Sequence, residues 1–152
     1  MSKVFLLSLL LLLSTVSATA RKVVRVACVG NSITYGTGIA NRERDAYPSQ
    51  LQRLLGKDFV VGNFGKPGAT LLRHGHRPYF LQTEFRDALQ FKADIAVIHL
   101  GINDTDPRNW PFFRDDFTKD RTRHLCAHHF QMAIFIIFHN SQSKDKYSHT
   151  SD

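Results

Sequence analysis

Val26-Ala-Cys-Val-Gly-Asn-Ser-Ile-Thr-Tyr-Gly36 joins an apolar, β-type run to a glycine-flanked loop that carries one serine, Ser32. A continuous apolar run of this kind predicts a strand that is buried on both faces of a parallel sheet. Open α/β sheets bind their ligands outside the carboxyl ends of the strands. We therefore expect Ser32 to stand at that edge of the sheet, in the place where chemistry would occur.

Strands and helices alternate along the chain outward from this stretch. The expected strands are 21–29, 59–63 and 94–100, and the expected helices are 45–55 and 81–91. Pro48 suits the first turn of the earlier helix, and Gly56 suits its end. Leu51, Leu54 and Leu55 have the i, i+3, i+4 spacing of an apolar helix face. This alternation is typical of an α/β fold whose parallel strands are joined by right-handed crossovers.

Each of the three strands ends in a loop with glycine and either serine or asparagine, so the three loops should meet at one sheet edge. A serine hydroxyl becomes a useful nucleophile only when a base takes its proton, and acyl transfer also needs donors for the developing oxyanion. The backbone N–H of Ser32, the N–H of Gly65 and the side-chain amide of Asn103 would provide three such donors. The pattern predicts an esterase-like site with Ser32 as the catalytic nucleophile.

Three blocks, Gly30–Thr34, Asn63–Gly68 and Gly101–Asp104, resemble in sequence and order the motifs of the SGNH or GDSL-type esterase family. The resemblance implies a three-layer α/β/α, flavodoxin-like SGNH hydrolase fold with a parallel sheet. It also implies an oxyanion hole of Ser32, Gly65 and Asn103, with no metal and no organic cofactor. Within the family, the chain is most similar to bacterial carbohydrate O-acetylesterases of the sialate O-acetylesterase type.

The chain departs from the family pattern in two ways. Asn31 replaces the aspartate of the motif that names the family, and we expect its side chain to shape the loop without taking part in chemistry. The fourth block, Asp-x-x-His, is missing, because no histidine follows an aspartate at that spacing. His124 and His149 each follow an aspartate by four positions, so the catalytic histidine and its aspartate remain unknown. The resemblance covers about 23–117, and the fold is therefore expected to be truncated at its C-terminus.

The chain is predicted to hold one domain, with a different segment at each end. Residues 1–20 have a basic start, an apolar core and small residues before position 21, as in a cleaved secretory signal peptide that leaves no stable membrane anchor. Residues 21–118 form the N-terminal part of the hydrolase domain. Residues 119–152 lose the apolar pattern apart from one strand-like run, 132–138. We interpret them as a divergent tail that is frameshifted, spliced or poorly ordered, with a native short variant of the family as the alternative. The protein is therefore expected to be exported, to a bacterial periplasm or beyond.

Other polar residues have weaker functional signals. Asp104 is expected to cap the following helix, and His99 to be a satisfied histidine of the core. His74 and His76 either line a substrate cleft or lie in a solvated loop. The tail histidines His124, His128 and His129, near Cys126, are only loosely similar to a metal cluster, and no metal site is predicted.

The charge and composition of the chain limit the kinds of partner that it could bind. The net charge of +7 comes from scattered basic residues without interleaved aromatics, which argues against nucleic-acid binding. We expect an exported serine esterase that removes acetyl groups from carbohydrate, such as O-acetylated sialic acid. The alternatives are a catalytically dead, carbohydrate-binding remnant and a lipid-ester hydrolase. The sequence does not indicate an oligomeric state.

Overall fold

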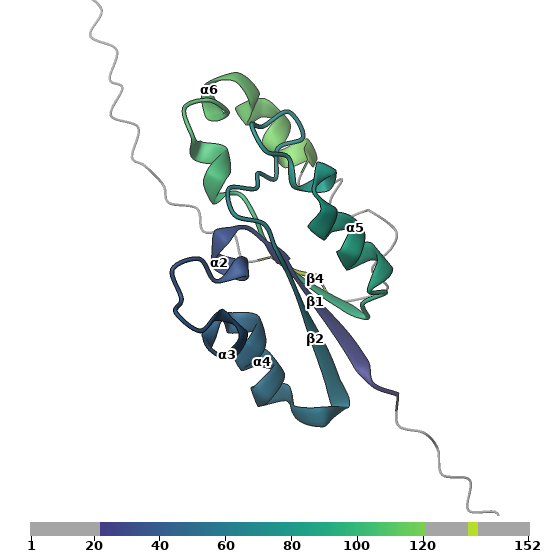
Figure 1. Cartoon of the computed structure of the whole chain (residues 1–152). Coiled ribbons are helices and arrows are strands. Elements are labelled where there is room, and N and C mark those ends of the chain that lie inside the picture. Colours follow the sequence, from purple (N-terminus) through teal and green to yellow (C-terminus); the bar gives the residue numbers. More distant parts are fainter. Residues whose placement is uncertain (1–21, 121–133, 137–152) are drawn as a thin grey trace, which may run out of the picture.

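Four parallel strands form the central sheet of the computed structural model, which describes residues 22–120 and 134–136 (Figure 1). The sheet order is β2-β1-β3-β4. The strands are β1 (Val24–Gly30), β2 (Phe59–Gly65), β3 (Ile95–His99) and β4 (Ile134–Ile136). The first three agree with the predicted strands within a few residues at each end, and β4 lies inside the predicted strand-like run 132–138.

The strand register places the carboxyl ends of β2, β1 and β3 at the same level. Gly30 of β1 pairs with Gly65 of β2 on one side and with His99 of β3 on the other. The chain passes from β1 to one neighbour and then crosses to the other, so a topological switch point lies between β1 and β3. Ligands of open α/β sheets bind in the crevice at such a point.

Helices cover both faces of the sheet. In Figure 1, α4 (Tyr47–Leu55) lies on one side of the strands and α5 (Thr83–Gln90) on the other. Alternate residues of β1 face these two layers: Cys28 contacts Tyr47 of α4, whereas Val29 joins Ala88 of α5 in the core. This confirms the three-layer α/β/α arrangement. The shorter helical segments are α2 (Ser32–Tyr35), α3 (Arg42–Asp45), η1 (Gly56–Asp58), η2 (Tyr79–Leu81), η3 (Ile102–Thr105), α6 (Trp110–Phe113) and η4 (Arg114–Asp116).

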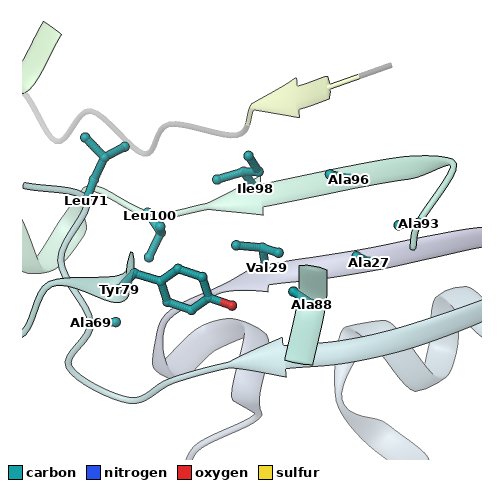
Figure 2. Close-up of a cluster of buried hydrophobic side chains, with 10 residues drawn as sticks. All are labelled: Ala27, Val29, Ala69, Leu71, Tyr79, Ala88, Ala93, Ala96, Ile98 and Leu100. Atoms are coloured by element: carbon teal, nitrogen blue, oxygen red, sulfur yellow. The ribbon is translucent and has the colours of Figure 1, made fainter. Parts of the chain in front are cut away.

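The main core lies on the α5 side of the sheet and extends onto the long loop after β2. Figure 2 shows the ring of Tyr79 directed from this loop toward Val29 and Ala88. Tyr79 is fully buried, and its hydroxyl donates a hydrogen bond to the carbonyl of Phe64. The cluster comprises Ala27, Val29, Ala69, Leu71, Tyr79, Ala88, Ala93, Ala96, Ile98 and Leu100. Loop and sheet therefore share one core.

The bounds of α4 match the prediction, with Pro48 in its first turn and Gly56 as its C-cap. The prediction for Leu54 was wrong: its side chain is 85% exposed, because the helix buries a narrower face that includes Leu51 and Leu55 only in part. The division at 118 stays a prediction, as does the signal peptide, whose residues 1–20 lie outside the described part. Within that part, none of the helices has the length and apolar character needed to cross a membrane.

Candidate active site

Ser32 is the first residue of α2, and the single residue Asn31 separates it from the end of β1. The side chain of Asn31 accepts a hydrogen bond from the N–H of Ile33 at 3.0 Å and so caps the helix. The Asn31 N–H donates to the carbonyl of His99 at 3.3 Å, which ties the turn to β3. Asn31 is fully buried, and its Nδ2 has no hydrogen-bond partner among the described residues. The expectation that Asn31 shapes the loop is confirmed.

Two glycines let α2 pack tightly against the strand ends. A Cβ on Gly65 would lie 2.1 Å from the backbone nitrogen of Tyr35, and one on Gly30 would lie 2.0 Å from the Thr34 hydroxyl. Real Cβ atoms do not approach other atoms so closely, so only glycine allows the helix backbone to lie there. The helix that presents Ser32 is therefore seated on the end of β2, and the first two sequence blocks form one packed unit.

The three predicted oxyanion donors differ in their present partners. The N–H of Ser32 is at the first position of a helix, where no intrahelical acceptor exists. The N–H of Gly65 donates to the side-chain oxygen of Asn63 at 3.0 Å, so this donor is engaged. The Asn103 amide donates one hydrogen to the carbonyl of Ala69 at 2.8 Å, which leaves its second hydrogen for a ligand. The roles of all three as oxyanion donors stay predictions.

Asp104 corrects the prediction of a helix cap. Its fully buried carboxylate accepts hydrogen bonds from the N–H groups of Leu71 and Leu72, at 2.9 and 2.6 Å. Burial raises the pKa of this carboxyl, although the bonds to the two amides act in the opposite direction. The residue binds the loop after β2, because the segment after β3 passes directly beside that loop.

Two further side chains hold the same loop and were not predicted. Asn109 is buried, and it accepts from the N–H of His76 and contacts the Nδ1 of that ring at 2.9 Å. Asp120 is also buried, and it accepts from the N–H of Arg73 at 2.9 Å. Neither stands in a motif, so no local sequence signal indicates them. Together with Asp104, they provide acceptors for four backbone amides of the loop.

The catalytic base is not found among the described residues. The Ser32 hydroxyl makes no hydrogen bond to a histidine in the described part of the chain. His74 is exposed and lies 3.9 Å from the carboxylate of Asp116, and His76 is exposed beside Asn109. His99 is half-buried at the last position of β3, so it lies at the rim of the core, at the carboxyl edge of the sheet. His124, His128, His129 and Cys126 lie outside the described residues.

These features define the class of protein: it has an α/β fold of the SGNH-hydrolase type. The loops that carry the serine, the glycine and the asparagine follow strands whose carboxyl ends lie at the same level, beside the switch point. The chain belongs to the GDSL-like Lipase/Acylhydrolase family, whose profile matches residues 28–133.

Comparison with known proteins gives relatives consistent with this family. An acetylxylan esterase of Xylanibacter ruminicola is 46% identical over 107 residues, which are 68% of this chain and 22% of that protein. The solved structure of AlinE4, an SGNH-hydrolase family esterase, is 18% identical with a TM-score of 0.51, and the match covers 76% of this chain and 58% of AlinE4. Another solved structure has 20% identity and a TM-score of 0.57, over 75% and 62% of the two chains. The solved structures support the fold. The chain spans about a fifth of the length of the acetylxylan esterase and less than two thirds of each solved structure.

Proposed function

We propose that this protein hydrolyses acetyl esters of carbohydrate hydroxyl groups, with Ser32 as the nucleophile. The observation that carries the proposal is the register of Gly30 with Gly65 and His99, which places the three motif loops at one edge beside the switch point. Membership of the GDSL-like family and the likeness to an acetylxylan esterase support an ester as the substrate.

In the proposed reaction, the Ser32 oxygen attacks the acetyl carbonyl and passes its proton to a base outside the described residues. The negative charge on the carbonyl oxygen is stabilised by the Ser32 N–H and the second hydrogen of the Asn103 amide. The Gly65 N–H can join them when the oxyanion replaces the Asn63 oxygen, which now lies 3.0 Å away. The sugar hydroxyl leaves with a proton, and water then releases acetate and restores the serine.

The substrate and the site of action are also proposed. An acetylated xylan chain and an O-acetylated sialic acid both offer an acetyl ester of a sugar hydroxyl. The name of the 46% identical relative favours xylan, whereas the sequence motifs resemble those of the sialate esterases. We propose further that residues 1–20 export the protein, because such polymers lie outside the cell.

The experiment is hydrolysis of p-nitrophenyl acetate by the 152-residue chain, with Ser32→Ala and Thr37→Ala measured in parallel. Thr37 is exposed just beyond α2, so its variant removes a nearby hydroxyl outside the turn that presents Ser32. We expect Ser32→Ala to lose on the order of 10⁶ in kcat, as removal of a catalytic serine does elsewhere, and Thr37→Ala to match the wild type. Equal rates for Ser32→Ala and wild type would refute the proposal. Absent turnover with retained binding of acetylated glycan would instead indicate the dead remnant, and faster cleavage of long-chain esters would indicate a lipid-ester hydrolase.

A further inference from the structure

A polar pocket of about 270 Å³ opens at the carboxyl end of β2, next to the predicted oxyanion glycine. In Figure 1, α2, α3 and α4 lie on one side of β2 and α5 on the other, and the pocket draws its walls from all of them. Its lining residues are Tyr35, Arg42, Glu43, Ser49, Asn63, Gly65 and Glu84. Ser32 is not among them, so the pocket is adjacent to the proposed reaction centre and separate from it.

The walls hold polar groups whose hydrogen-bonding capacity is unused. The Arg42 guanidinium lies over the Tyr35 ring, 4.1 Å from its centroid, and makes no hydrogen bond to a described residue. The same holds, within the described ranges, for the Glu43 carboxylate and the Ser49 hydroxyl. One oxygen of Glu84 pairs with Lys66 at 3.0 Å, and the other is buried with no partner in the described part. That second oxygen is closed off from the pocket, so the groups left for a ligand are those of Arg42, Glu43 and Ser49, which can both donate and accept hydrogen bonds.

The charges around the pocket balance. Arg42 and Lys66 offset Glu43 and Glu84, and the Lys66 ammonium is already occupied by Glu84. Among the described residues, an anionic ligand would meet the carboxylates of Glu43 and Glu84 and only the Arg42 guanidinium to offset them. A neutral polyol suits the walls better, because each hydroxyl both donates to carboxylate oxygens and accepts from guanidinium N–H groups. The planar Arg42 guanidinium lies over the Tyr35 ring, and its N–H groups can meet a pair of acceptor oxygens.

The size of the pocket limits the ligand. Sites for drug-sized ligands measure roughly 300–1,000 Å³, and this pocket is slightly smaller, so it suits a single sugar residue. We propose that the pocket binds one neutral sugar residue of the glycan chain whose neighbouring residue carries the acetyl ester. This inference rests on the proposed function for its link to Ser32, since Gly65 belongs both to the pocket and to the predicted oxyanion hole.

The test is binding of unacetylated xylotetraose to the 152-residue chain, followed through backbone amide shifts in ¹⁵N NMR spectra. The probe contains no ester, so the result is independent of turnover. We expect the largest shifts at Tyr35, Asn63 and Gly65, and N-acetylneuraminic acid, which is anionic, to bind more weakly. Glu43→Gln removes the charge and replaces one acceptor oxygen with an NH₂ group that cannot accept, so its Kd should rise about threefold or more.

Asp115→Asn is the matched control, because this side chain is 99% exposed and lies outside the pocket. It should bind xylotetraose as the wild type does. If Glu43→Gln fails to fold, Ser49→Ala takes its place and should also weaken binding. Equal affinity of the pocket variants and the control, shifts confined to other regions, or tighter binding of the anionic sugar would overturn the inference. If the wild-type protein binds xylotetraose in a Glu43-dependent way but does not hydrolyse p-nitrophenyl acetate, the proposed function is refuted and the inference about the pocket stands.

Discussion

Replacing Asp104 tests whether the segment after β3 holds the loop after β2. The carboxylate is fully buried and accepts from the N–H groups of Leu71 and Leu72, at 2.9 and 2.6 Å. Asp104→Ala removes the carboxylate to which both of these buried amides donate. Each unsatisfied donor costs about 1–3 kcal/mol, so the free energy of unfolding should fall by about 2–6 kcal/mol. Such a loss is a large share of the roughly 5–15 kcal/mol that stabilises a typical domain.

Asp104→Asn should cost less. Its amide oxygen can accept from one N–H, while its NH₂ group faces the other donor, so about half the loss is expected, roughly 1–3 kcal/mol. Asp115→Asn is the surface control, since that side chain is 99% exposed and should change stability by no more than about 0.5 kcal/mol.

Urea unfolding can be followed by the fluorescence of Trp110, which is the single tryptophan of the chain. Trp110 packs edge-on against Phe117, with ring centroids 5.7 Å apart, so its environment reports on this part of the fold. The expected order of stability is wild type and Asp115→Asn, then Asp104→Asn, then Asp104→Ala. A value for Asp104→Ala within about 0.5 kcal/mol of the wild type would refute the reasoning, because the two amides would then have other acceptors.

Three further predictions follow from single contacts. Burial raises the folded-state pKa of Asp104, so the folded protein takes up this proton at higher pH than the unfolded chain. As pH falls through that pKa toward the ordinary value of 3.8, wild-type stability should therefore rise relative to Asp104→Asn, and a difference that is constant with pH would contradict this. Gly65→Ala should destabilise by about 1–3 kcal/mol, because the added Cβ meets the Tyr35 backbone at 2.1 Å; an unchanged urea midpoint would show that α2 does not rest on Gly65. Burial raises the pKa of Cys28 to about 11, which lowers its thiolate fraction near pH 8 about a hundredfold relative to a pKa of 9.0. Iodoacetamide should therefore label Cys28 only in urea, as read by peptide mass spectrometry, and rapid labelling of the native protein would contradict its burial.

The strands and their order along the chain could be predicted because each is marked by an apolar run in the local sequence. The apolar run before Gly30 is buried as expected, and the pattern of 94–100 contains β3. Parallel pairing then requires the following loops to meet at one edge, so the proximity of the three motif loops followed from fold class alone. The nucleophile and the three oxyanion donors could therefore be proposed from the positions of these loops alone, without knowledge of any side-chain contact.

The structural roles of individual residues were harder to predict from the sequence. Gly65 was predicted only as an oxyanion donor, whereas in the structure the α2 backbone also occupies the space that a side chain there would need. Asp104 resembled a helix cap because an acidic residue after a strand often serves that purpose, but its partners lie more than thirty positions earlier in the chain. Contacts of this kind depend on tertiary packing, and a sequence pattern read in short windows does not contain them.

The loop from 66 to 78 illustrates what this means for the site. It has little regular structure of its own, yet its amides at Leu71, Leu72, Arg73 and His76 all donate to side-chain oxygens. Those oxygens belong to Asp104, Asn109 and Asp120, all within one stretch that begins after β3. The Asn103 amide adds a fifth link through Ala69. The predicted oxyanion asparagine therefore helps to fix the loop that follows its predicted partner glycine, Gly65, so the third block can hold the end of the second in place. A change anywhere in 103–120 that loosens this loop should alter the spacing of the oxyanion donors before it alters Ser32.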